Sequence, residues 1–218
     1  MLVLALDTAT PASTAALVEV TADGLFGVAE NRTVDPRAHG EKLAPEITAV
    51  LTDAGVRPRD LTAIVAGLGP GPFTGLRVGL ATAASMGQAL GIPTYGVCSL
   101  DALGLAAGPG RVLIATDARR REVYYATYAD GVREFGPEVA KPADVTVNAD
   151  KAAGEGALKY GDVFGVPVQE HLLYPPGAAL VAIAADRIRE AAPSEILTPL
   201  YLRRPDAVEP AGRKPVLT

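Results

Sequence analysis

The chain has 218 residues, 49% of them hydrophobic and 21% charged, which is enough to bury a core without cross-links. Its single cysteine, Cys98, excludes a disulfide framework, and a formal net charge of −5 argues against autonomous nucleic-acid binding, which needs a basic surface. The first residues lack the basic stretch of a signal peptide, and no uncharged apolar run is long enough to span a membrane. We therefore expect a cytoplasmic protein without a membrane partner.

Apolar runs and turn signals divide the first half of the chain into short elements. The run that ends on Asp7 is typical of a buried strand, and the next two strands follow so closely that an antiparallel meander is expected. In chain order we predict strands over 2–7, 13–20 and 25–30, a helix over 40–53, a strand over 61–67, a helix over 74–90, a strand over 93–97 and a helix over 99–107.

The second half repeats this opening. Asp117 ends its first strand as Asp7 ends the first strand of the chain, which indicates an internal duplication of a strand-strand-strand-helix unit. The predicted elements here are strands over 111–117, 122–128, 132–135 and 163–168 and a helix over 178–192. A partly extended tail should follow, punctuated by Pro193, Pro199, Pro205, Pro210 and Pro215.

A glycine-rich loop, Gly67-Leu-Gly-Pro-Gly-Pro-Phe-Thr-Gly-Leu-Arg77, joins the strand over 61–67 to the helix over 74–90. Glycines let the backbone approach a ligand, and a helix start offers free N–H groups to an anion. It is not a Walker loop, since no Lys-Ser or Lys-Thr follows, and it lacks the third glycine of the Rossmann fingerprint. Two interpretations stay open: an anion site, or a rigid turn that fixes how strand and helix pack.

Two carboxylates end strands at matching places. Asp7 precedes Thr8 and Thr10, a group that can hold hydrated magnesium and phosphate oxygens or cap a turn. Asp117 precedes Arg119–Arg121, which can contact phosphate or an acidic partner, or form a solvated hairpin tip. The candidate residues of a degenerate nucleotide cleft are Asp7, Thr8, Gly69, Gly71 and Asp117.

Small residues recur at every fourth position of the helix over 74–90, at Gly75, Gly79, Ala83 and Gly87. Such a stripe lets another helix approach closely, either the helix over 40–53 or one from another subunit. Each glycine inside a helix costs about 1 kcal/mol relative to alanine, so a packing role is expected.

Other chemistry finds little support in the sequence. His39 is followed at the fourth position by Leu43 instead of a second histidine, so we predict no metal pair there and treat His39 as a surface or capping residue. The chain lacks a Gly-x-Ser-x-Gly elbow, which leaves hydrolase-type nucleophilic catalysis unsupported.

Four segments together resemble the motifs of the TsaB (YeaZ) family, in the family's order. They are Leu4-Ala-Leu-Asp-Thr-Ala-Thr10, Gly69-Pro-Gly-Pro-Phe-Thr-Gly-Leu-Arg77, Asp117-Ala-Arg-Arg with Glu122-Val-Tyr124, and Pro199-Leu-Tyr-Leu-Arg203. Pro72 is a departure, because the family usually has serine there. The resemblance implies an α/β, actin-like (ribonuclease-H-like), two-lobed fold. We expect a first lobe over 1–104 and a second over 105–218, with its last segment packing back on the first lobe.

The resemblance also implies a function. Members of this family are regarded as non-catalytic scaffold and activating subunits that pair with TsaD and, with TsaE, transfer a threonylcarbamoyl group to the tRNA adenosine next to the anticodon. A homodimer is expected in the partner's absence, tRNA contact only through the complex, no cofactor for the chain alone, and ATP or ADP only at the joint interface. The expected partner surface lies on the first two helices, with Leu43, Ile47, Gly75, Gly79, Ala83 and Gly87.

An ATP-dependent phosphotransferase of the actin-like class is the alternative. Asp7 would then hold magnesium and Asp117 would stand at the second phosphate position. The sequence leans against it, because Ala118 and Arg119 stand where nucleotide-binding relatives tend to have glycine. A metalloprotease would need a metal pair that the two histidines do not make.

Overall fold

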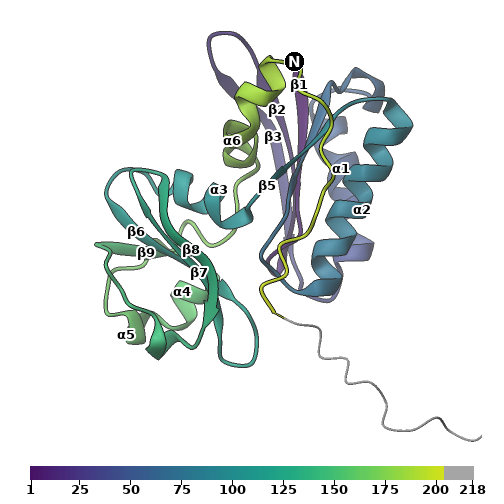
Figure 1. The fold of residues 1–218 in the computed structure, drawn as a ribbon. Coiled ribbons are helices and arrows are strands. Elements are labelled where there is room, and N and C mark those ends of the chain that lie inside the picture. The colour runs from purple at the N-terminus through teal and green to yellow at the C-terminus, as the bar shows by residue number, and fades with distance from the viewer. Residues whose placement is uncertain (204–218) are drawn as a thin grey trace, which may run out of the picture.

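Two β-sheets divide the chain, one built from its first half and one from its second (Figure 1). The computed structural model describes residues 1–203, so Pro205, Pro210 and Pro215 lie outside the described residues. Among the helices of this part, none is long and apolar enough to cross a membrane. The predicted α/β fold with two lobes, each built around one sheet, is confirmed.

The first sheet has the strand order β3-β2-β1-β4-β5. Strands β1, β2 and β3 form the predicted antiparallel meander, and β4 and β5 add to it in parallel with β1. Strand β1 is buried on both faces, as expected for an uninterrupted apolar run at the centre of a sheet. The strands are β1 (Leu2–Asp7), β2 (Ala12–Val20), β3 (Leu25–Val34), β4 (Ala63–Gly67) and β5 (Thr94–Val97).

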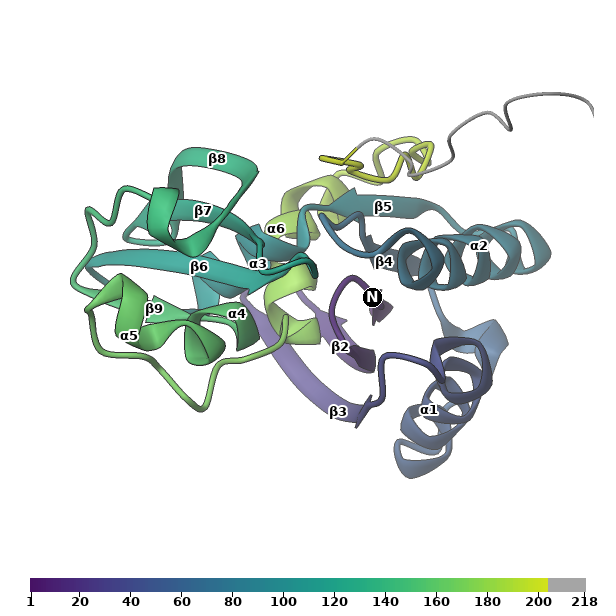
Figure 2. The same ribbon diagram turned by 90° about the horizontal axis from the view of Figure 1, so that it is seen from below.

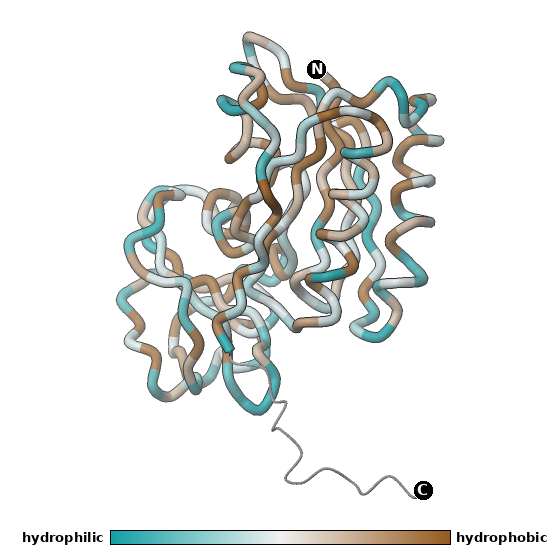
Figure 3. The backbone as a smooth tube through the Cα atoms, turned by 45° about the vertical axis from the view of Figure 1, so that its right-hand side comes forward, coloured by the Kyte–Doolittle hydropathy of each residue, from teal (hydrophilic) through white to brown (hydrophobic). Residues whose placement is uncertain are grey.

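Helices cover both faces of this sheet (Figures 1 and 2). Alternate residues of β1 point to opposite faces. Leu4 and Leu6 pack with α1 (His39–Asp53) and α2 (Phe73–Leu90), whereas Val3 and Ala5 pack with α6 (Gly177–Arg189). Hydrophobic residues therefore recur along the strands and on the inward sides of the helices (Figure 3).

The second sheet repeats the first in a reduced form. Its order is β8-β7-β6-β9, with β6, β7 and β8 antiparallel and β9 parallel to β6, as β4 is to β1. The helix after the third strand is missing, and only a 3₁₀ turn (Pro142–Asp144) stands in its place. The elements are β6 (Arg111–Asp117), β7 (Val123–Ala129), β8 (Val132–Ala140), β9 (Lys151–Ala153), α4 (Glu155–Lys159) and α5 (Gly161–Phe164).

The predicted strand over 163–168 is wrong. Residues Gly161–Phe164 form helix α5, which ends at Gly165 with φ +68°, and Val168 makes only an isolated bridge to Ala152. The apolar residues of this segment pack under the second sheet and touch its edge only at this bridge, which periodicity alone does not distinguish from a strand.

Helix α3 (Ser99–Ala106) and the last segment connect the two lobes. Ala102 of α3 packs with the core of the first lobe, and Leu103 packs with that of the second. After α6 the chain runs back along the first sheet, where the Leu200 N–H donates to the Leu68 carbonyl at 2.8 Å. Arg203 then forms an ion pair with Glu122 of the second lobe.

The small-residue stripe of α2 faces the chain's own first lobe. A Cβ atom at Gly79 would overlap Thr8, and one at Gly87 would overlap Thr94. All six residues expected at a partner surface are buried inside the chain: Leu43, Ile47, Gly75, Gly79, Ala83 and Gly87. The stripe therefore explains how α2 packs on its own sheet, and a partner could reach only the opposite faces of α1 and α2.

Gly79→Ala should destabilise the protein, because its methyl group would meet Thr8. We expect a loss of about 2 kcal/mol in the free energy of unfolding, within the range for overpacked cores. Gly40→Ala in α1 is the matched control, since a Cβ atom there meets nothing within 4 Å. It should leave the stability unchanged or raise it by up to about 1 kcal/mol. Urea denaturation followed by circular dichroism measures both, and equal effects would contradict the packing described here.

Candidate functional site

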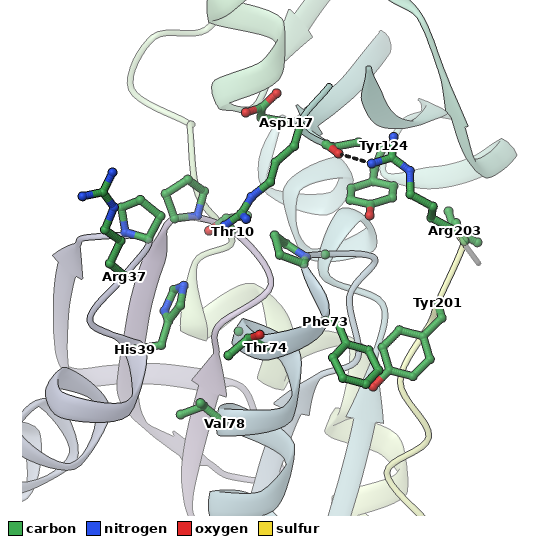
Figure 4. A pocket seen from close by; sticks show the side chains of 18 of the residues that line it. Thr10, Arg37, His39, Phe73, Thr74, Val78, Asp117, Tyr124, Tyr201 and Arg203 are labelled. Atoms are coloured by element: carbon green, nitrogen blue, oxygen red, sulfur yellow. Dashed lines mark hydrogen bonds between the residues drawn. The ribbon is translucent and has the colours of Figure 1, made fainter. Parts of the chain in front are cut away.

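A cavity of about 690 Å³ lies between the two lobes (Figure 4). Residues from three parts of the chain line it. The first lobe contributes Thr10, Pro11, Pro36, Arg37, His39, Gly40, Gly71, Pro72, Phe73, Thr74, Gly75 and Val78; the second lobe contributes Asp117, Ala118, Arg119 and Tyr124; the last segment contributes Tyr201, Leu202 and Arg203.

Asp7 does not line this cavity. Its Oδ2 accepts a hydrogen bond from Ser99 Oγ at 2.5 Å, its Oδ1 accepts one from the Ala9 N–H at 3.0 Å, and the residue is 1% exposed. The backbone of Gly67 lies so close that a Cβ atom there would overlap the carboxylate. Burial raises the pKa of Asp7 to about 6. Asp7 therefore fastens the turn after β1 and is not placed to hold magnesium.

Thr8 and Gly69 are also used inside the first lobe. Thr8 Oγ1 donates to the Gly75 carbonyl at 2.7 Å and accepts from the Gly79 N–H at 3.1 Å. The Gly69 N–H donates to Ser99 Oγ at 3.2 Å. For Gly69 the structure therefore supports the rigid-turn interpretation. Gly71 does line the cavity, with its Cα packed against the backbone of Ala9.

Asp117 lines the cavity but is already engaged. Its Oδ1 lies 3.2 Å from Lys159 Nζ, and its N–H donates to Glu155 Oε1 at 3.0 Å. Burial raises the pKa of Glu155 to about 7. Of the five predicted nucleotide-cleft residues, only Gly71 and Asp117 line the cavity, so the two strand-end carboxylates do not face each other across it.

His39, expected at the surface or in a cap, is 8% exposed and forms part of the cavity wall. Its Nδ1 lies 2.8 Å from Ser13 Oγ, and burial lowers its pKa, so the ring is neutral at pH 7. Ser13 finds an acceptor only if its hydroxyl donates to Nδ1, which places the ring proton on Nε2. A Cβ atom at Gly75 would lie 3.3 Å from Nε2, so this nitrogen faces the first turn of α2. Sequence reasoning missed this role because Ser13 lies on strand β2, far from His39 in the sequence, and their spacing carries no signal.

Arg119 reaches the cavity from a constrained hairpin. Arg119, Arg120 and Arg121 all have positive φ (60°, 51° and 61°), a left-handed conformation that costs an L-residue about 1 kcal/mol. Hydrogen bonds hold the hairpin: the Ala118 N–H donates to the Glu122 carbonyl and the Glu122 N–H to the Arg119 carbonyl, each at 2.9 Å. The charge of Arg119 contributes to the lowered pKa of His39, across the gap between the lobes. Arg119 is exposed at the tip of this hairpin and also lines the cavity, so the structure is consistent both with a solvated tip and with contact to a bound anion.

An aromatic stack forms one wall of the cavity. The rings of Phe73 and Tyr201 stack with their centroids 5.1 Å apart. The Arg77 guanidinium lies 3.6 Å from the centroid of Phe73, and its Nε donates to the Tyr201 hydroxyl at 3.2 Å. These contacts fix the last described residues over the start of α2 (Figure 4).

Within residues 1–203, no three His, Cys, Asp or Glu side chains gather closely enough to hold a metal ion.

Asp7→Asn should change how stability depends on pH. Because burial raises the pKa of Asp7 from 3.8 to about 6, the carboxyl stabilises the fold fully below pH 3.8, and this contribution is lost as the pH rises through 6. Relative to Asp7→Asn, the wild type should lose about 2 kcal/mol of unfolding free energy between pH 4 and pH 7. Denaturation of both proteins across this range measures it, and parallel pH curves would contradict the burial of this carboxyl.

Comparison with known proteins gives the family. A family model described as "TsaD: tRNA N6-adenosine threonylcarbamoyltransferase" matches residues 31–207. The "tRNA threonylcarbamoyladenosine biosynthesis protein TsaB" of Escherichia coli is 35% identical over 71% of this chain and 69% of its own length. A solved structure described as "YeaZ from Pseudomonas aeruginosa" superposes with a TM-score of 0.76 at 30% identity, covering 92% of this chain and 99% of that one.

Mycobacterial relatives are more similar in sequence. An uncharacterised protein of Mycobacterium leprae is 50% identical over 94% of this chain, but the chain spans only 56% of that protein's length. An uncharacterised protein of Mycobacterium tuberculosis is 52% identical over 94% of this chain and 93% of its own length. The family model, the E. coli relative and the shared fold agree with the four motifs in the sequence: the chain belongs to the TsaB (YeaZ) family.

Proposed function

We propose that this protein acts in the cytoplasm in the biosynthesis of tRNA threonylcarbamoyladenosine, as a non-catalytic scaffold and activating subunit that docks on TsaD. The names of its relatives support the pathway. One observation supports the docking role: the outward face of α2 carries no charge after Arg77. Its exposed residues are Ala81, Ala84, Ser85, Gln88 and Ala89.

An exposed helix face of this kind is unusual in a soluble protein. Solvent-facing helix positions normally carry charged residues, whereas the centres of interfaces are depleted in charge. The adjoining face of α1 exposes Ala44, Pro45 and Thr48, and its one charged residue, Glu41, lies a turn closer to the start of the helix. Glu46 is on another side of α1, where it accepts a hydrogen bond from Thr33 of β3. We call the exposed residues 44, 45, 48, 81, 84, 85, 88 and 89 the α1–α2 face.

The α1–α2 face suits another pair of helices. Its alanines and serine would let partner helices approach closely, as at tightly packed helix crossings. Docking there would order the active site of TsaD, and TsaE would complete the complex. Without the partner, the same face would pair two copies of this chain. Transfer RNA would be contacted through the complex, and ATP or ADP would be bound at the joint interface.

The alternative phosphotransferase is not favoured by the geometry. Magnesium-dependent phosphoryl transfer needs carboxylates that face the transferred phosphate. The carboxylate of Asp7 is buried and hydrogen-bonded to Ser99, and that of Asp117 forms an ion pair with Lys159.

Ala81→Glu should weaken binding to TsaD at least tenfold, because a carboxylate would have to be buried unpaired in the interface. Ala178→Glu is the matched control: Ala178 is an exposed alanine on α6, which covers the opposite face of the first sheet. The control should bind TsaD as the wild type does. Isothermal titration calorimetry with purified TsaD measures both variants. Unchanged binding by Ala81→Glu, or equal losses in the two variants, would rule out the α1–α2 face as the docking surface.

A further inference from the structure

We propose that the cavity between the lobes is a phosphate-binding site, in which His39, Arg119 and the first turn of α2 hold the phosphate group. The site belongs to this chain alone and does not depend on the partner proposed above.

Two helix starts provide backbone donors to the cavity. Helix α1 begins at His39 after Ala38, and helix α2 begins at Phe73 after Pro72; neither start has a side-chain cap. The first N–H groups of a helix have no acceptor within the helix, and the helix dipole makes such a start favourable for an anion. Both first turns line the same cavity, at His39, Gly40, Phe73, Thr74 and Gly75.

His39 supplies an independent and directed donor. The side chain is more than nine-tenths buried, and Ser13 occupies its Nδ1. Its Nε2 faces Gly75 at the start of α2, and no hydrogen bond to it forms within residues 1–203. This nitrogen is not itself buried but is open to the cavity, where an anion can accept its proton in a hydrogen bond. A phosphate oxygen beside Gly75 would accept from Nε2 and from the backbone of α2 together.

Among the side chains that line the cavity, positive charges are in excess; the nearby carboxylate of Asp35, which acts to raise the pKa of His39, is not part of the lining. Asp117 is neutralised by Lys159, and Arg203 by Glu122. Arg37 and Arg119 also line the cavity, and neither has a carboxylate partner within residues 1–203. Arginine binds phosphate through a rigid planar fork of donors, and the hairpin holds Arg119 in place at the cost of an unfavourable backbone conformation.

The size and the walls of the cavity favour a phosphate monoester over free phosphate. A volume of about 690 Å³ is typical of small-molecule sites and far exceeds what one phosphate group fills. Phe73, Tyr124 and Tyr201 offer aromatic surface beside the proposed phosphate position, against which an attached organic group could pack.

Titration of the full chain with three probes at constant ionic strength tests this site. The probes are inorganic phosphate, phenyl phosphate and acetate. Calorimetry and the backbone amide shifts in NMR measure the binding of each. We expect saturable binding of phenyl phosphate, tighter than that of inorganic phosphate, and no saturable binding of acetate. The amides of Thr74 and Gly75 should show the largest shifts. Saturation by inorganic phosphate alone would support the anion site but contradict the monoester preference.

Arg119→Gln should weaken phenyl phosphate binding at least tenfold. Arg121→Gln is the matched control, because Arg121 lies in the same hairpin with the same backbone conformation and does not line the cavity. It should bind like the wild type. The proposal is overturned by absence of saturable phosphate binding, by equal losses in the two variants, or by shifts that map away from α2. If a variant does not fold, the amide shifts of the wild-type protein still show whether phosphate binds at the start of α2.

Discussion

The hydrogen bonds of Asp7 and Thr8 hold the turn after β1, and the arrangement of the first lobe depends on them. Asp7 joins this turn to Ser99 at the start of α3, and Thr8 joins it to the first turn of α2. Gly67, Gly75 and Gly79 have no side chains because these contacts leave no space for them. A carboxylate and a hydroxyl suited to metal and phosphate chemistry are thus used to fix the positions of two helices.

The position in which this turn holds α2 separates the two candidate sites, the cavity between the lobes and the α1–α2 face. The start of α2 is held toward the cavity between the lobes, together with His39 and Arg119. The rest of α2 lies along the first sheet and leaves an uncharged outer face next to α1 (Figure 2). The last described segment links the lobes through the Phe73–Tyr201 stack and the Arg203–Glu122 ion pair, so it closes one side of the cavity.

Much of the fold was predictable because its signals are local. Apolar runs predicted the strands of the first sheet, and the matching places of Asp7 and Asp117 predicted the duplication. Strand β9 was missed because three residues, Lys-Ala-Ala, carry no strand pattern. The stripe of α2 was identified, but spacing does not show what it packs against. The roles of Asp7 and His39 depend on Ser99 and Ser13, distant in sequence, so their burial could not be predicted from spacing.

In the proposed role, this chain enables modification of the tRNA without performing it. The direct test supplies threonylcarbamoyl-AMP, tRNA and ATP to TsaD and TsaE, and measures threonylcarbamoyladenosine in the tRNA with this chain, without it, and with this chain alone. We expect modification only when this chain and TsaD are both present. Full modification in its absence, or modification by this chain alone, would contradict it.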